Sequence, residues 1–227
     1  MTAANRLEVL LDLRSPPVAM ALCPEPPAGV PRVSASAPSS CTYWKQAAEG
    51  RTFYTQAPDH YNCPIGAHTH GIDLPAERAG ELEQVIGTMV SLSYIRNEEV
   101  AGIPRLEGPF GVAVYSPLAA APCEPDVVLV RGNPKQLMLL AEAAWAAGAA
   151  GGSPLLGRPT CAAIPQALRA GGCAASLGCI GNRVYTELGD DELYFAVPGK
   201  QLDRVVEKLE GIVRANGELQ KYHRAKK

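Results

Sequence analysis

None of the seven cysteines in this 227-residue sequence belongs to a CxxC pair. This absence excludes a zinc ribbon and a ferredoxin-type cysteine run, because both take neighbouring ligands from that short spacing. The sequence also has no GxGxxG after a predicted strand, no Walker phosphate loop, no GxSxG elbow and no HExxH helix. The missing motifs argue against nucleotide-dependent and serine-hydrolase chemistry.

Positive charge is not in excess either. Lysine and arginine number 21 against 23 aspartate and glutamate residues, and the one basic cluster, at residues 220–227, is interpreted as a solvated tail. Glu8, Asp12 and Arg14 interrupt the apolar start of the chain before a signal-peptide core or a membrane span could form. We therefore expect a cytoplasmic protein that binds neither nucleic acid nor a membrane.

The length and the apolar content of 47% suit one well-packed domain, which we place over residues 1–227. Hydrophobic patterning predicts strands and helices that intermix without strict alternation, which favours an α+β fold with helices packed on a mixed or antiparallel sheet. Residues 57–73 are predicted to be a loop. The predicted helices cover residues 5–13, 41–49, 75–95, 161–170 and 200–219, and the predicted strands cover 18–22, 51–55 and 110–115.

Two segments, beginning at Asp126 and Asp191, align without a gap and share Asp, Lys, Gln, Leu and Glu at matching positions. Each is typical of an apolar strand, a turn with Gly and Pro, and a helix. A repeated strand-helix unit would explain the likeness, and so would convergent patterning.

Four cysteines, Cys41, Cys63, Cys161 and Cys179, lie in short segments rich in Gly, Pro, Ser and Thr. Structural cysteine usually lies inside an apolar run, so these positions favour metal ligands or reactive thiols. Because the four are far apart in the sequence, a shared site would have to be assembled by the fold.

Two of these cysteines are predicted to begin helices. Ser40 and Thr160 are expected to cap helices that start at Cys41 and Cys161. The positive end of a helix dipole stabilises a sulfur anion, so both positions favour a thiolate.

The segment GCIGNR places glycines on either side of Cys179, so that backbone amides can approach whatever the sulfur binds. Arg158 and Arg183 are close in sequence to Cys161 and Cys179. Their charge would offset the negative charge of a thiolate-bound cluster.

A second candidate site is the segment DHYNCPIGAHTHG, which contains His60, Cys63, His68 and His70. Imidazole and thiolate together suit zinc, iron or copper, and Asp59 could orient His60. This set is the alternative ligand group, for a single metal ion or a haem.

The remaining cysteines, Cys23, Cys123 and Cys173, are interpreted as structural. An odd number of cysteines in a chain without an export signal favours reduced thiols over a complete disulfide framework. If the thiols only pack, the protein would be a metal-free module that binds a small molecule.

Several long strings agree in order with a known family; they are SSCTYWKQAAEGRTFYTQAPDHYNCPIGAHTHGI, GRPTCAAIPQAL, SLGCIGNRVYTEL and DDELYFAVPGKQL. Over about residues 8–215 the chain resembles the uncharacterised family called domain of unknown function 169. The resemblance implies that the family's recurrent cysteines correspond to Cys41, Cys63, Cys161 and Cys179. It brings no established reaction with it.

The sequence thus leads to one principal hypothesis, an iron-sulfur cluster of the four-iron four-sulfur type bound by these four cysteines. Its role would be redox or Lewis-acid chemistry, with a redox partner or a small-molecule substrate. Neither a reaction nor an oligomeric state follows from the residues.

Overall fold

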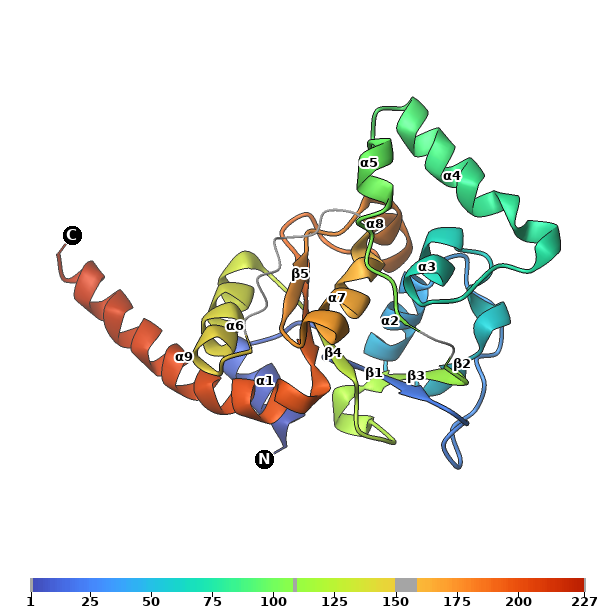
Figure 1. The fold of residues 1–227 in the computed structure, drawn as a ribbon. Coiled ribbons are helices and arrows are strands. Elements are labelled where there is room, and N and C mark those ends of the chain that lie inside the picture. Colours follow the sequence, from blue (N-terminus) through green and yellow to red (C-terminus); the bar gives the residue numbers. More distant parts are fainter. Residues whose placement is uncertain (1, 108–109, 150–158, 227) are drawn as a thin grey trace.

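Six antiparallel strands form one sheet in the computed structural model, which describes residues 2–107, 110–149 and 159–226. The strand order is β2-β3-β1-β4-β6-β5, and every pairing is antiparallel. Helices cover both faces of this sheet (Figure 1). The α+β prediction is therefore confirmed. The strands are β1 (Val18–Cys23), β2 (Phe53–Thr55), β3 (Val112–Pro117), β4 (Val127–Gly132), β5 (Ala174–Ser176) and β6 (Leu193–Pro198).

The period of two along each strand divides the core into two layers. In β4, Val127 and Leu129 face one layer, whereas Val128 and Val130 face the other. The first layer packs against α2 (Cys41–Ala48) and α7 (Ala163–Ala170). The second packs against α1 (Ala3–Leu11), α6 (Pro134–Ala146) and α9 (Leu202–Arg224). Because both faces are covered, the central strands are apolar on both sides.

The segments that begin at Asp126 and Asp191 each form a strand followed by a helix. β4 leads into α6 through a capping box in which Asn133 and Gln136 bond to each other's backbone amides. β6 leads into α9 through a 3-10 turn, η5 (Gly199–Gln201). The strands β4 and β6 are direct neighbours, and α6 and α9 lie on the same face.

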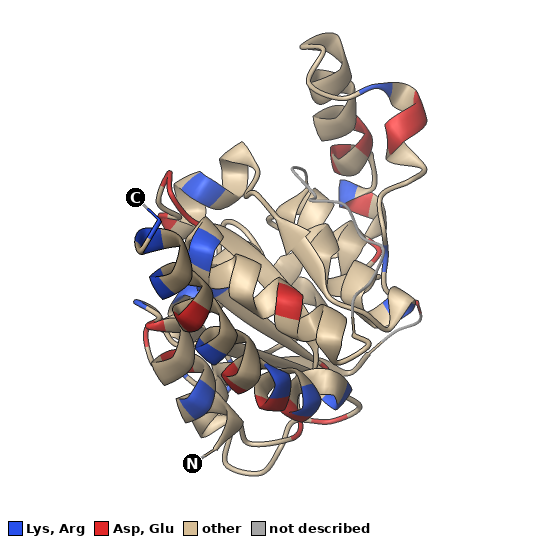
Figure 2. Cartoon of the chain, turned by 90° about the vertical axis from the view of Figure 1, so that its left-hand side faces the viewer, with Lys and Arg blue, Asp and Glu red and all other residues tan. Residues whose placement is uncertain are grey.

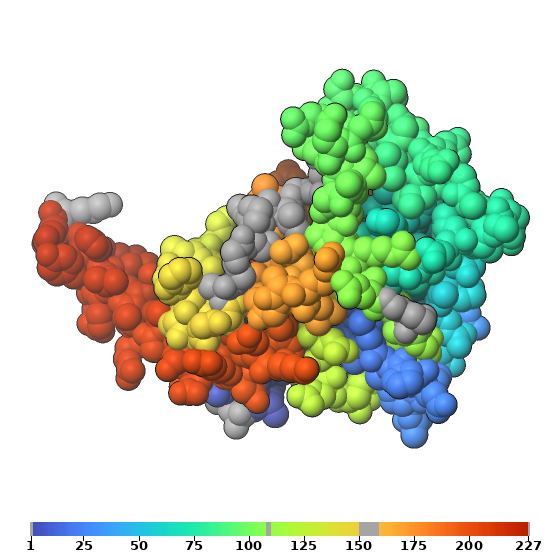
Figure 3. Space-filling model, viewed as in Figure 1, coloured from blue at the N-terminus to red at the C-terminus, as the bar shows by residue number. Residues whose placement is uncertain are grey.

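The predicted helix over residues 75–95 is shorter and more exposed than expected. It consists of a 3-10 turn, η2 (Ala76–Arg78), and α4 (Gly80–Ser91), and the chain turns away at Ser93, whose φ is 55°. Together with α5 (Asn97–Val100), α4 forms an arm that protrudes from the body (Figures 1 and 3). No residue of α4 is buried, and Leu92 is 74% exposed. Although its sequence is amphipathic, this helix therefore does not pack on the sheet.

The segment predicted as a loop at residues 57–73 contains η1 (Ala57–His60) and α3 (Pro64–Thr69), so that prediction is wrong for this part. Prolines at the first helical positions start both turns, since proline there loses no hydrogen bond. The strand β5 and the helix α8 (Ile180–Thr186) were not predicted from the sequence.

The last helix, α9, continues past the predicted end at 219 as far as Arg224. Its buried residues, Leu202, Val205, Val206 and Leu209, all belong to the first third of the helix. Beyond them, charges of both signs alternate along its surface (Figure 2). Among the described helices, none combines the length and apolar character needed to cross a membrane.

The two-layer core generates a stability prediction at Leu140, which is fully buried between α6 and the sheet. We expect Leu140→Ala to lower the free energy of unfolding by about 2–5 kcal/mol, because it removes apolar contacts and leaves a cavity. Chemical denaturation would measure this change. Leu92→Ala, on the exposed side of the arm, is the matched control and should stay within ~0.5 kcal/mol of the unsubstituted protein. Equal losses in both variants would contradict this description of the core.

Candidate functional site

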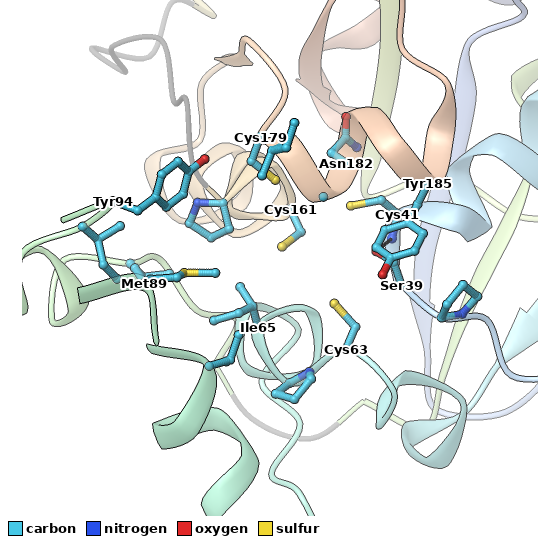
Figure 4. Close-up of a pocket in the computed structure, with 18 of the residues that line it drawn as sticks. Ser39, Cys41, Cys63, Ile65, Met89, Tyr94, Cys161, Cys179, Asn182 and Tyr185 are labelled. Atoms are coloured by element: carbon cyan, nitrogen blue, oxygen red, sulfur yellow. Dashed lines mark hydrogen bonds between the residues drawn. The ribbon is translucent and has the colours of Figure 1, made fainter. Parts of the chain in front are cut away.

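The four cysteines singled out from the sequence converge on one cavity. Cys41, Cys63, Cys161 and Cys179 all line a cavity of about 320 Å³. Figure 4 shows their four sulfurs arranged around its interior. Cys41 and Cys161 are buried, whereas Cys63 and Cys179 are partly exposed. The fold thus assembles a site from segments up to 138 positions apart, from residue 41 to residue 179.

Each of these cysteines lies at the start of a helical segment. Cys41 is the first residue of α2, and Cys161 lies in η4 (Thr160–Ala162), directly before α7. Cys63 and Cys179 are the residues that precede α3 and α8. The amide of Gly66 donates to the Cys63 sulfur at 3.3 Å. The start of a helix carries amides without an intrahelical acceptor and the positive end of the helix dipole, and both favour thiolates.

The two caps predicted from the sequence are wrong in detail. Ser40 makes no capping hydrogen bond; instead, Ser39 Oγ accepts from the Cys41 amide at 3.3 Å. Thr160 Oγ1 accepts from the amide of Cys179 at 2.6 Å. Thr160 therefore ties the segment of Cys161 to that of Cys179. Tertiary contacts override the local capping preference at both positions.

Close packing holds Cys63 against the segment that carries Cys41. A Cβ atom at Gly66 would lie 2.9 Å from Cys63 Sγ and 2.8 Å from Ser40 Cβ, which is too close for either contact. Only glycine fits at this position, and its backbone approaches both cysteine segments.

The pKa values of Cys41 and Cys161 are shifted in opposite directions. Hydrogen bonding from the Cys161 thiol lowers the pKa of Cys41, and the same interaction, with burial, raises the pKa of Cys161 well above its usual value. Cys41 therefore loses its proton first, and Cys161 retains one as the donor. Burial raises the pKa of Cys63. A cation in the cavity would favour deprotonation of all these thiols.

Asn182, which the sequence analysis did not single out, is the polar side chain best placed to support Cys41. Its amide helps to lower the pKa of Cys41, and its Nδ2 has no hydrogen-bond acceptor within the described residues. The residue lines the cavity and is 1% exposed. The signal was present in GCIGNR, but its placement depends on α8, which was not predicted.

Of the two arginines expected to offset cluster charge, Arg183 does not line the cavity. The Arg183 guanidinium donates to the carbonyls of Leu177, Gly189 and Glu192, so it braces the loops around α8 instead. Arg158 lies outside the described residues. Backbone amides and Asn182 are thus the groups that the structure offers for stabilising negative charge.

His60 and His70 lie behind the cysteines, fully buried, with ring centroids 4.9 Å apart. Thr55 Oγ1 donates to the Ala113 carbonyl, so it accepts from His60 Nε2 at 2.9 Å, and His60 Nδ1 then accepts from Ser40 Oγ at 2.9 Å. Both nitrogens of His60 are therefore occupied within the protein.

His70 is held in the same way. Its Nδ1 donates to the Gly66 carbonyl at 2.7 Å, and the Tyr115 hydroxyl lies 3.4 Å from its Nε2. Burial lowers the pKa of His70 to about 4 and, together with the nearby His70 ring, places the pKa of His60 well below its usual value. Both rings are neutral supports for the cysteine segments.

The alternative ligand set of His60, Cys63, His68 and His70 is not brought together. His68 is partly exposed. Its pKa is lowered, first by burial and then by the charge of Arg105, while Asp73 acts in the opposite direction. Asp59 bonds to Arg32 and not to His60. Across residues 2–107, 110–149 and 159–226, no group of three or more His, Cys, Asp or Glu side chains converges closely enough to share a single metal ion.

The opposite wall of the cavity is mainly apolar, although Glu99 of α5 also lines it. Val85 and Met89 of α4 line it with Ile95 and Ile103, which flank α5. The arm does not pack on the sheet. Its side chains instead line the cavity on the side opposite the cysteines (Figure 4).

Fold and site together define a class: an antiparallel α+β protein with a four-cysteine cavity that a protruding helical arm borders. The chain belongs to the family DUF169, described as Uncharacterised ArCR, whose profile matches residues 6–208. This agrees with the predicted family-like region of about 8–215. No curated protein and no solved structure matched the chain.

The buried histidines predict a pH dependence of stability. Because the folded pKa values of His60 and His70 lie below the ordinary value of 6.5, the unfolded chain takes up protons that the folded protein does not. The free energy of unfolding is therefore expected to fall as the pH is lowered from 7 towards 5, by up to about 1.4 kcal/mol per pH unit for each histidine.

Denaturation curves at several pH values would test this expectation. His70→Gln should flatten the slope, whereas His223→Gln, at an exposed position of α9, should leave it unchanged. An unaltered slope in His70→Gln would show that His70 does not carry the effect.

Proposed function

We propose that this protein binds a four-iron four-sulfur cluster through Cys41, Cys63, Cys161 and Cys179. The observation that carries the proposal is the convergence of four thiols, from four separate segments, around one cavity. Thiolate is the usual ligand of such clusters, and each iron takes one. The all-thiol donor set fits this group better than it fits calcium or magnesium, which prefer oxygen ligands.

A cluster and a single metal ion place different demands on the arrangement of the sulfurs. A tetrahedral zinc ion requires its sulfurs at about 2.3 Å from one point. The sulfurs of a cluster lie farther apart, because each binds a different iron at a separate corner. Sulfurs that surround a cavity, with no three of the described His, Cys, Asp or Glu side chains meeting at one point, agree with the second geometry.

The surroundings would stabilise the negative charge of the bound cluster. The helix starts beside Cys63 and Cys179 carry backbone amides. The Nδ2 of Asn182 has no acceptor among the described residues, so it is available as a hydrogen-bond donor. Hydrogen bonds to cluster sulfur raise the reduction potential, whereas the apolar wall disfavours added negative charge. These residues would therefore tune the potential of the group.

We further propose a redox role. Four cysteine ligands leave no iron with an open position, which favours electron transfer over Lewis-acid chemistry. Cys63 and Cys179 are partly exposed, so a redox partner could approach on their side. A reducing compartment such as the cytoplasm would keep the seven free thiols available.

Metal and sulfide analysis of anaerobically purified protein tests the proposal. We expect four iron and four acid-labile sulfide per chain with visible charge-transfer absorption. Alanine substitution of Cys41 or Cys161, the buried ligands, should remove iron and sulfide together. Protein that contains neither iron nor sulfide and cannot be reconstituted anaerobically would overturn the proposal.

Two variants serve as controls. Cys173→Ala removes a buried thiol that packs on the other face of the sheet, and His68→Ala removes a residue of the alternative set. Both should retain full iron and sulfide. Loss of iron in His68→Ala with an intact fold would favour the histidine site instead.

A second candidate function, binding of a small apolar molecule without metal, is favoured by the composition of the arm. The walls formed by α4 and its flanking residues are apolar, and pockets of this size and character commonly bind uncharged ligands. The neutral fluorophore 1-aminoanthracene would report such binding.

Under this second function, iron-free protein is expected to bind the fluorophore with enhanced emission, and Met89→Arg should abolish the enhancement by placing a charge in the cavity. Leu92→Arg, on the exposed side of the same arm, is the control. Equal emission from Met89→Arg and the unsubstituted protein would exclude the cavity as the binding site.

A further inference from the structure

A second thiol pair lies outside the cysteine cavity. The sulfurs of Cys23 and Cys123 are 3.9 Å apart, although the residues are separated by 100 positions in the sequence. Cys23 ends β1, and Cys123 lies in the connection between β3 and β4. The fold therefore brings together two cysteines that have no local relationship.

This pair and the cavity lie on opposite faces of the sheet. Cys23 and Cys123 pack against Ala21, Val112 and Val114. The neighbouring positions Met20, Ala113 and Tyr115 face the layer that contains Cys41 and Cys161. Successive strand residues point to opposite faces, so chemistry at one thiol site does not require the other.

Backbone hydrogen bonds hold the two thiols in place. The Leu22 amide donates to Asp126 Oδ2 at 2.7 Å, and the Asp126 amide donates to the Met20 carbonyl at 2.9 Å. These bonds join the end of β1 to the segment that follows Cys123. The short distance between the sulfurs is thus fixed by both flanking chains.

The pair can also be reached from solvent. Both thiols are partly exposed, and the residues next to them, Pro24, Pro122 and Glu124, are exposed. A disulfide requires its sulfurs at about 2.0 Å, so a shift of under 2 Å or a change of side-chain rotamer would complete the bond.

We infer that Cys23 and Cys123 form a redox-sensitive disulfide, with a low-molecular-weight disulfide as oxidant. The Cys23 thiolate attacks glutathione disulfide, forms a mixed disulfide and releases one glutathione thiolate. Cys123 then loses its proton and attacks the protein sulfur of that mixed disulfide, which forms the Cys23–Cys123 bond and releases the second glutathione. Two protein thiols are oxidised, and one glutathione disulfide is reduced to two glutathione molecules.

The second step is assigned to Cys123. Burial, followed by the charge and hydrogen bond of Cys23, raises the pKa of Cys123 to about 11, which disfavours its thiolate as the first nucleophile.

The bond would fix the start of residues 24–40, the segment that leads to Ser39 and Cys41 at the cavity. It would also close a long loop in the unfolded chain, which stabilises the folded protein. The oxidised protein should therefore unfold at a higher temperature than the reduced protein.

Equilibration of the full-length protein in anaerobic glutathione buffers, followed by acid quenching, alkylation and peptide mass mapping, tests the inference. We expect Cys23 and Cys123 to lose alkylation together, with a peptide that links them, in one titration. In Cys123→Ser the linked peptide should be absent and the rise in unfolding temperature lost. Cys23→Ala provides the same test if the first variant does not fold.

Cys173 is buried in the core layer on the side of α9. Its alkylation therefore reports unfolding in the same samples. A linked peptide that forms only when Cys173 becomes alkylated, or that forms under no buffer ratio, would overturn the inference. Iron and sulfide contents of Cys123→Ser should equal those of the unsubstituted protein. Failure of the disulfide and failure of the cluster proposal are therefore measured separately.

Discussion

The packing of α2 and α7 on one face of the sheet is the constraint on which the cysteine cavity depends. Trp44 and Ala47 anchor α2, and Ile164 and Ala167 anchor α7, in the same buried layer. Once these apolar faces are buried, the start of α2 and the turn before α7 both border the cavity, and Cys41 and Cys161 line it together. Hydrophobic burial thus positions the thiols, and Cys41 and Cys161 are themselves part of this buried layer.

A polar network under this pair fixes the remaining geometry. Ser40 bonds to His60, and the Tyr43 hydroxyl donates to the Asp59 carbonyl at 2.6 Å. Arg32 closes the network by binding the Asp59 carboxylate. Ser40, His60, Tyr43 and Asp59 are each hydrogen-bonded in this network, so it holds the segments of Cys41 and Cys63 in one arrangement. The histidines that are attractive as ligands from the sequence instead provide this support.

The cavity combines two kinds of wall with different chemistry. Helix starts and Asn182 lie on the cysteine side, whereas Val85 and Met89 contribute apolar side chains on the side of the arm. Apolar surroundings strengthen the interaction between hydrogen-bond donors and an anion. The cavity therefore accounts for the apolar side chains of α4, although this helix does not pack on the sheet.

The sequence by itself determined the α+β class, most strands, the family and the four cysteines that share a cavity, because turn-forming surroundings and apolar periodicity are local properties. Only the tertiary structure decided the roles of Thr160, Asn182 and Arg183, since each depends on a segment distant in the chain or on the position of α8. The pairing of Cys23 with Cys123 is of the same kind: strand order brings the two sulfurs together, and no local pattern encodes a contact across 100 residues.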